Sequence, residues 1–167
     1  MLQRCKVGLG GGIEAETRTC SYVDVSVHVL PSREKSILER TISRAASVFD
    51  IPRGQIEYGS CVRYRPGQEF KYHQDTFTGH WTTLSRRWSM VIALTTLEVS
   101  HGGATKFLQY PAASTQPVQG RALCWLNTID RTSTEVDPRS VHSGSMLSEG
   151  APDKWILTFW GRDSPNW

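Results

Sequence analysis

The sequence contains no long apolar run, no Cys-x-x-Cys pair and no stripe of basic residues. A helix that crosses a bilayer needs about 20 consecutive apolar residues, so neither a membrane span nor a membrane partner is expected. Nineteen basic residues against 16 acidic ones leave a formal charge of +3, and the basic residues are dispersed. The charge pattern therefore gives no reason to expect a nucleic-acid partner.

The N-terminal residues MLQRCKVGLGGG also lack the apolar segment and cleavage site of a signal peptide, which favours a cytoplasmic location. The glycines at 7–12 lack the strand, helix and lysine of a phosphate-binding loop, so a turn is expected there. The cysteines are widely spaced and are expected to be reduced structural thiols. They are Cys5, Cys20, Cys61 and Cys124.

The 167 residues show no repeat or linker and predict a single domain, 1–167, with residues 1–14 as a flexible N-terminal segment. A helix is predicted from Ser32, which can cap it, to Asp50, with Pro52 beyond its end. Apolar residues recur at helical spacing along it. They are Leu38, Ile42, Ala45 and Phe49.

Short strands are predicted to follow the helix. Residues 56–64 have a period of two that places one set on a shared face: Ile56, Tyr58, Ser60, Val62 and Tyr64. Further strands are predicted within 69–75, 89–97, 104–108 and 121–127, and in the alternating segment 154–160. Six or more strands after one or two N-terminal helices predict a mainly β fold, a sandwich or jelly roll braced by helix.

Two residues of "YHQDTF", His73 and Asp75, are candidate metal ligands. On an extended segment, residues i and i+2 point to the same side, and imidazole with carboxylate suits Fe(II), Mn(II) or Zn(II). The alternative is a turn aspartate beside a histidine that bonds the backbone. His142, on a predicted short strand, is the candidate third ligand. Two histidines and one carboxylate on one face of an octahedron are typical of non-haem Fe(II) oxygenases.

Lys154 begins the alternating strand 154–160, at a position on its inward face. An unpaired buried ammonium is costly, so an inward lysine needs an acidic partner. The alternative is an edge lysine whose amine reaches solvent. Tyr64 and Thr105 offer hydroxyls that can help to hold a carboxylate.

Five segments occur in the order and approximate spacing of one family: RYRPGQEFKYHQD, GGATKF, GRALCWLN, SVHSG and KWILTFW. Over about residues 15–162 the chain resembles the prolyl 4-hydroxylase-like 2-oxoglutarate/Fe(II) dioxygenases. The resemblance implies a double-stranded β-helix (jelly-roll) core. It also implies a catalytic Fe(II) site at His73, Asp75 and His142, with Lys154, Tyr64 and Thr105 binding 2-oxoglutarate.

By the same resemblance, the expected reaction couples decarboxylation of 2-oxoglutarate to succinate with hydroxylation of a substrate C–H bond. O2 would be the oxidant, and ascorbate is expected to stimulate the enzyme. A proline-containing peptide or protein is the expected substrate, as in procollagen-proline 4-dioxygenase. A carboxylate at Asp75 favours hydroxylation over halogenation.

The resemblance also suggests residues that meet the substrate. Trp160 matches a family position that packs against peptide, although a core tryptophan is the alternative. Phe70 stands where members often have a tyrosine that contacts substrate. Residues 76–87, with Trp81, Arg86 and Arg87, are predicted to face the substrate or to form a solvated loop.

Three departures from the pattern leave alternatives open. The spacing from His142 to Lys154 is longer than is usual in the family, so Arg162 is considered as a substitute for the lysine. "GGAT" has alanine where the family commonly has glutamate. Phe70 and the short chain keep open the hydroxylation of a free amino acid or other small molecule. A non-catalytic jelly-roll binding module and a zinc hydrolase are the remaining alternatives, but a zinc hydrolase would not account for Lys154.

Overall fold

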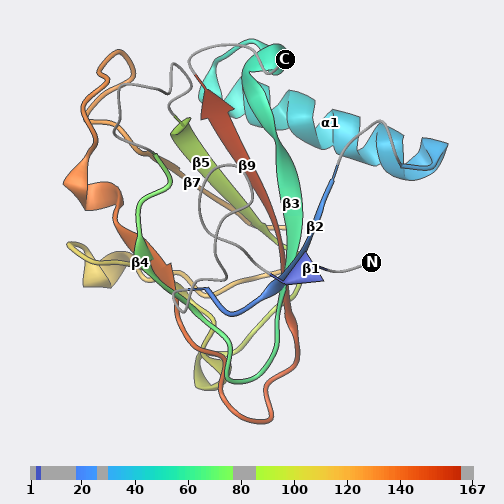
Figure 1. The fold of residues 1–167 in the computed structure, drawn as a ribbon, viewed down its shortest axis with the longest axis vertical. Helices are drawn as coiled ribbons and strands as arrows, with labels where there is room; N and C mark the ends of the chain where they lie inside the picture. Colours follow the sequence, from blue (N-terminus) through green and yellow to red (C-terminus); the bar gives the residue numbers. More distant parts are fainter. Residues whose placement is uncertain (1–2, 5–17, 26–29, 77–85, 163–167) are drawn as a thin grey trace.

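A computed structural model describes residues 3–4, 18–25, 30–76 and 86–162. Its strands form two antiparallel sheets, and β4 lies on the side opposite the helix α1 (Figure 1). The larger sheet has the order β1 (Gln3–Arg4), β2 (Ser21–Asp24), β3 (Ile56–Tyr64), β9 (Lys154–Arg162), β5 (Arg86–Ala93) and β7 (Ala122–Leu126). The smaller sheet has the order β4 (Phe70–His73), β8 (His142–Gly144) and β6 (Thr105–Phe107). The prediction of a mainly β fold with helical support is confirmed.

The described residues contain one α-helix, α1 (Ser32–Phe49), close to its predicted bounds. Its N-cap is Pro31, whose carbonyl accepts the first intrahelical bond from Lys35 N–H at 2.9 Å. Ser32 was therefore wrongly predicted as the cap, because the chain already turns into the helix one residue earlier. Asp50 ends the helix in the left-handed conformation, with φ 57°.

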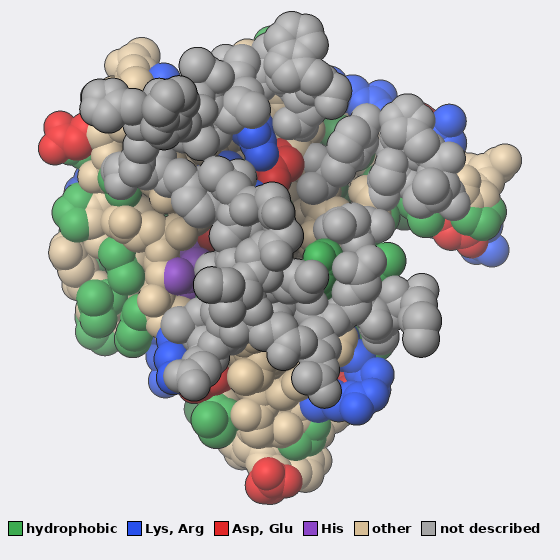
Figure 2. Space-filling model, in the orientation of Figure 1, with side chains coloured by type: hydrophobic (Ala, Val, Ile, Leu, Met, Phe, Trp, Pro, Cys, Tyr) green, Lys and Arg blue, Asp and Glu red, His purple; other side chains and the backbone are tan. Residues whose placement is uncertain are grey.

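The described part of the chain also has four short 3-10 helices between its longer elements: η1 (Arg53–Gln55), η2 (Val99–His101), η3 (Pro111–Ala113) and η4 (Pro138–Ser140). None of the helices in the described ranges is long and apolar enough to span a bilayer. On the face shown in Figure 2, the described Lys and Arg side chains lie in several separate groups, in agreement with the dispersed charge of the sequence.

An outer core lies between α1 and the larger sheet. The predicted apolar stripe of α1 is buried there, together with Trp88 and Met90 of β5 and Phe159 of β9. Phe159 is 0% exposed, and Ile42 is 3% exposed. The helix therefore covers one face of the sheet and leaves the other face to the interior between the sheets.

The interior core lies on the opposite face of the larger sheet, where Val62 and Tyr64 pack with Leu147 and Ile156. Ile56, at the other end of β3, belongs to the outer core instead. The prediction of one continuous face for 56–64 is therefore wrong. The β3–β9 register shifts between Glu57 and Ser60, and such a bulge reverses which side chains face inward.

Cys20 is buried and disulfide-bonded, whereas Cys61 and Cys124 are free. The expectation of reduced thiols is thus wrong at Cys20. Disulfide formation depends on the separation of the Cα atoms in space, which cysteine spacing in the sequence does not determine. The glycines at 7–12 and His28 lie outside the described residues.

Candidate active site

His73, Asp75 and His142 come together as predicted, at the end of the smaller sheet where β4 finishes and β8 begins. His73 ends β4, His142 begins β8, and the two are paired in register. Asp75 lies in a bend two residues beyond β4. One ligand atom from each residue lies within 4.8 Å of the others. Asp75 Oδ1 is 3.5 Å from His73 Nε2, and Asp75 Oδ2 is 3.8 Å from His142 Nε2.

Backbone carbonyls orient both imidazoles. His73 Nδ1 lies 2.8 Å from the carbonyl oxygen of Lys71, and His142 Nδ1 lies 2.9 Å from that of Ser140. A carbonyl only accepts, so each Nδ1 carries the proton and donates it. Each Nε2 is then left with a lone pair directed toward the centre of the cluster. Two such nitrogens with one carboxylate fit a divalent first-row metal ion.

Two buried residues that the sequence analysis missed hold Asp75 in place. Ser89 Oγ donates to Asp75 Oδ2 at 2.6 Å. Asn127 Nδ2 donates to Ser89 Oγ at 2.8 Å and to the Arg86 carbonyl at 3.0 Å. Ser89 is 1% exposed and Asn127 is 0% exposed. The signal for Ser89 was a hydroxyl on the inward face of an otherwise apolar strand, while Asn127 gave no comparable signal.

The charge states of the cluster suit metal ligation. Burial alone would raise the pKa of Asp75, but the close approach of the His73 and His142 imidazoles and the hydrogen bond from the Ser89 hydroxyl lower it below its usual range. Burial is also the main cause that lowers the pKa of His142. Asp75 is therefore a carboxylate and His142 a neutral imidazole near neutral pH, which are the forms that bind metal.

Aromatic rings enclose the histidines. The Phe70 ring stacks on His73 with 3.5 Å between ring centroids, and Trp125 meets His142 edge-on at 4.6 Å. The Arg18 guanidinium lies 4.7 Å from the Phe70 centroid on the ring face. Phe70, predicted as a substrate residue, thus directly contacts a candidate ligand.

Lys154 is buried at the start of β9, with 4% of its surface exposed. Its Nζ donates to the Gly103 carbonyl at 2.6 Å and lies 5.4 Å from the centroid of the Tyr64 ring. A Cβ added to Gly144 would lie 3.9 Å from this Nζ, so the amine lies beside β8, two residues beyond His142. Among the described residues no carboxylate pairs with it, and burial lowers the pKa of Lys154 to about 8.

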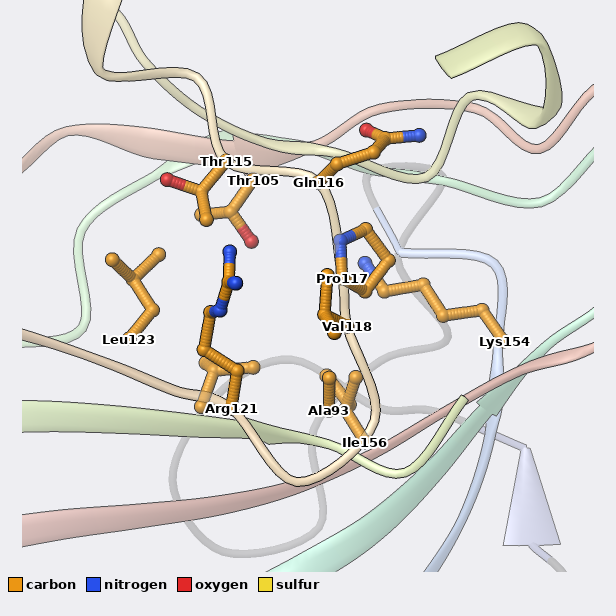
Figure 3. Close-up of a pocket in the computed structure, with 11 residues that line it drawn as sticks. Ala93, Thr105, Thr115, Gln116, Pro117, Val118, Arg121, Leu123, Lys154 and Ile156 are labelled. Atoms are coloured by element: carbon orange, nitrogen blue, oxygen red, sulfur yellow. The ribbon is translucent and has the colours of Figure 1, made fainter. Parts of the chain in front are cut away.

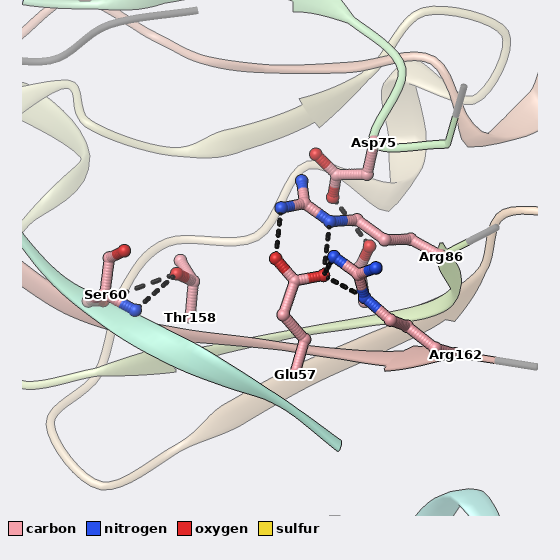
Figure 4. A network of polar contacts seen from close by, with 7 residues as sticks. Glu57, Ser60, Asp75, Arg86, Thr158 and Arg162 are labelled. Carbon is pink, nitrogen blue, oxygen red and sulfur yellow. Dashed lines mark hydrogen bonds and ion pairs between the residues drawn. The ribbon is translucent and has the colours of Figure 1, made fainter. Parts of the chain in front are cut away.

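Lys154 and Thr105, two of the three predicted 2-oxoglutarate residues, line one pocket (Figure 3). The third, Tyr64, lies next to the amine of Lys154, as described above. Arg162, the considered substitute for Lys154, has a different partner. Its Nε donates to Glu57 Oε2 at 2.6 Å (Figure 4).

Glu57 accepts hydrogen bonds from two arginines on neighbouring strands. Besides Arg162, Arg86 donates to it through Nε at 2.8 Å and Nη2 at 2.5 Å. The Arg86 guanidinium lies 3.7 Å above the centroid of the Trp160 ring. Trp160 is therefore half-buried on the inward face of β9 beneath this network.

Arg86, rather than Arg87, is the arginine that the structure brings to Trp160. The β5–β9 register shifts between Arg86 and Trp88, and this bulge redirects the side chains at the start of β5. Arg87 Nη1 instead donates to the Arg131 carbonyl at 2.8 Å. Trp81 and His80 lie outside the described residues. His101 accepts from Glu98 N–H and completes the cap of η2.

The chain is similar in sequence to several known proteins. Residues 59–162 match the sequence model of the 2OG-Fe(II) oxygenase superfamily. Prolyl 4-hydroxylase 1 of Arabidopsis thaliana is 29% identical over 174 residues, covering 93% of this chain and 57% of that protein. Probable prolyl 4-hydroxylase 9 of the same plant is 27% identical and is covered to 54%. The chain thus spans about half the length of these curated relatives.

A solved structure supports the fold. The viral collagen prolyl hydroxylase of Paramecium bursaria Chlorella virus-1, crystallised with 2-oxoglutarate, superposes with a TM-score of 0.74 at 17% identity, covering 89% of this chain and 81% of that one. This likeness confirms the prediction that the two sheets form a jelly-roll core. The chain belongs to the 2OG-Fe(II) oxygenase superfamily.

Proposed function

We propose that the chain is an Fe(II)- and 2-oxoglutarate-dependent hydroxylase of the prolyl 4-hydroxylase type. One observation carries the proposal: a buried lysine amine without a carboxylate partner among the described residues lies beside the strand that begins with His142. A 2-oxo dicarboxylic acid would span this distance, with its 2-oxo acid end on a metal ion at the cluster and its distal carboxylate at Lys154.

In this proposal the protein's residues bind and orient the reactants. His73, Asp75 and His142 hold Fe(II), which supplies the redox chemistry that couples 2-oxoglutarate decarboxylation to substrate hydroxylation. Lys154 neutralises the distal carboxylate of 2-oxoglutarate. Tyr64 flanks the amine, and Thr105 offers a hydroxyl to the same carboxylate.

The proposed substrate is a proline-containing peptide or protein. Its support is that the curated relatives are named as prolyl 4-hydroxylases. A free amino acid or other small molecule is the second candidate. It is favoured by Phe70, which stacks on His73 where family members often present a tyrosine to the substrate.

The metal centre is tested by anaerobic titration with Fe(II) and 2-oxoglutarate, followed by visible absorption. The expected result is the weak charge-transfer band of a 2-oxo acid chelated to Fe(II). His142→Ala should abolish the band, whereas His101→Gln, outside the cluster, should retain it. A band that persists in His142→Ala would remove His142 from the ligand set.

The substrate class is tested by measuring succinate release over a panel of proline-containing peptides and free amino acids, with mass detection of the product. A peptide that both accelerates succinate release and gains one oxygen supports the prolyl hydroxylase assignment. Oxygen gain by a free amino acid alone would favour the second candidate. Intact binding of 2-oxoglutarate without turnover on any substrate would favour the binding module.

A further inference from the structure

The pocket in Figure 3 contains a second basic residue that the sequence analysis did not single out. Apolar side chains of β5, β7 and β9 form one wall, and residues 115–118 form another. Lys154 and Arg121 are its two cationic lining residues, and no acidic residue is among those that line it. A pocket with apolar walls and two cations suits the charged end of an aliphatic acid.

The backbone around Arg121 is fixed. Its N–H donates to the Val118 carbonyl at 2.9 Å, and its carbonyl accepts from Ala93 N–H at 3.0 Å. Gly120, just before it, has φ 82°, a conformation in the left-handed region that favours glycine. This tight turn holds Arg121 at the rim of the pocket, immediately before β7.

The side chain of Arg121 is directed into the pocket. Figure 3 shows its guanidinium extending toward Thr105, while Lys154 extends toward the pocket from the other side and its amine overlaps Pro117 in this view. The described residues provide no carboxylate partner for either cation. The two differ in burial, because Lys154 is 4% exposed whereas Arg121 is exposed to solvent.

We propose that Arg121 is a second cationic determinant for the distal carboxylate of 2-oxoglutarate, acting together with Lys154. The inference rests on the proposed function. Lys154 provides a short-range contact in a dry environment, where loss of one partner of a charge pair is costly. Arg121 provides an attraction that is weaker and more sensitive to salt, because solvent screens it. Together they select a dicarboxylic 2-oxo acid over a monocarboxylic one.

Calorimetric titration of Mn(II)-loaded protein with 2-oxoglutarate tests the proposal without turnover. Arg121→Gln should weaken binding about two- to fivefold, the range for a solvent-exposed ion pair. The difference should shrink at high salt. Arg53→Gln, an exposed arginine on η1 away from the pocket, is the matched control and should leave binding unchanged. Arg121→Lys should restore much of the affinity.

The ligand also has a matched control. 2-Oxobutyrate is 2-oxoglutarate without the distal carboxylate, so its binding should not distinguish Arg121→Gln from wild type. Equal 2-oxoglutarate affinity in wild type and Arg121→Gln, with binding lost in Lys154→Met, would overturn this inference alone. Failure of the wild-type protein to bind 2-oxoglutarate would overturn the proposed function as well. Thermal unfolding of Arg121→Gln should match wild type, because the side chain is exposed.

Discussion

At the scale of single residues, the orientation of Asp75 depends on uncharged partners. Ser89 donates to one carboxylate oxygen, and Asn127 in turn donates to Ser89. This chain of hydrogen bonds is buried, so water does not compete for it. Asp75 is therefore held toward the two imidazoles by the protein itself, which lowers the reorganisation needed when a metal ion binds.

Ser89→Ala is predicted to weaken metal binding about 10- to 100-fold, the usual effect of removing a hydrogen bond to a metal ligand. The affinity would be measured by calorimetric titration with Mn(II). Ser43→Ala, at an exposed serine of α1, is the control and should leave the affinity unchanged. An unchanged Mn(II) affinity in Ser89→Ala would show that Asp75 does not need this hydroxyl.

The lowered pKa of Lys154 predicts how 2-oxoglutarate binding depends on pH. In the ligand-free protein its pKa is about 8, and the amine loses its charge above that pH. The carboxylate needs the charged amine, so the affinity of Mn(II)-loaded protein for 2-oxoglutarate should fall about tenfold per pH unit above 8. 2-Oxobutyrate, which has no distal carboxylate, should show no such fall.

The same shift affects stability with the opposite sign. Because burial lowers the folded-state pKa below the ordinary 10.5, keeping Lys154 protonated penalises the ligand-free fold at neutral pH. This penalty is relieved as the pH rises from about 8 toward 10.5. The contribution of Lys154 to stability therefore increases over the pH range in which the affinity for 2-oxoglutarate decreases. A fall of both stability and affinity with rising pH would contradict the assignment of this pKa to Lys154.

At the scale of elements, regular segments could be predicted from the sequence and irregular ones could not. The helical spacing of Leu38, Ile42 and Phe49 correctly identified the buried face of α1. Alternation also correctly placed Lys154 and Ile156 on one face of β9, where both line the pocket. These patterns are predictable because burial of one face repeats with the period of the element.

At the bulges in β3 and β5, the alternation of the sequence predicts the wrong faces. An added Cβ at Gly59 would lie 1.8 Å from the Thr158 carbonyl oxygen, so only glycine allows β3 to approach β9 this closely at its bulge. The register shift turns Glu57 to the same face as Arg86 and Arg162. Strict alternation along β3 predicts the opposite face for Glu57. The glycine was visible in the sequence, but its close neighbour lies about 100 residues away.

The buried and exposed faces of α1 give a matched pair of stability predictions. Ile42→Ala, at 3% exposure, should lower the free energy of unfolding by about 2–5 kcal/mol, because it removes buried methyl groups and leaves a cavity. Ile37→Ala makes the same chemical change on the same helix at 48% exposure and should cost much less, within about 1 kcal/mol. Urea unfolding followed by circular dichroism measures both. Similar losses of unfolding free energy in the two variants would mean that α1 packs against the sheet through a different face.

At the scale of the whole molecule, the candidate site joins both sheets. His73 and His142 belong to the smaller sheet, and Asp75 follows β4, whereas Lys154 belongs to the larger sheet. The ordered sequence motifs predicted this assembly through the family resemblance. The Ser89–Asn127 support was not predicted, because Ser89 lies on β5 and Asn127 lies just after β7, and only the pairing of these two strands brings them together.

The metal ligands and Lys154 lie on different sheets. A metal ion and 2-oxoglutarate should therefore stabilise the protein cooperatively. A coupling of about 1–3 kcal/mol is typical, and for a domain of this size each kcal/mol raises Tm by about 2–4 °C. Mn(II) and 2-oxoglutarate together should therefore raise Tm by more than the sum of their separate effects. Differential scanning fluorimetry with a chelator control measures this, and strictly additive shifts would contradict the shared site.

The interior core described above also connects the two sheets. Leu147 is 1% exposed and packs with Val62 and Ile156, and Phe70 of β4 packs against the same cluster. These side chains join β3 and β9 of the larger sheet to β4 of the smaller one, so we expect a change in their volume to alter the separation of the sheets and the length of the cosubstrate that fits. A library of interior variants, selected for use of shorter or longer 2-oxo diacids, should therefore yield changes at Leu147 and Val62, which contact neither end of the ligand.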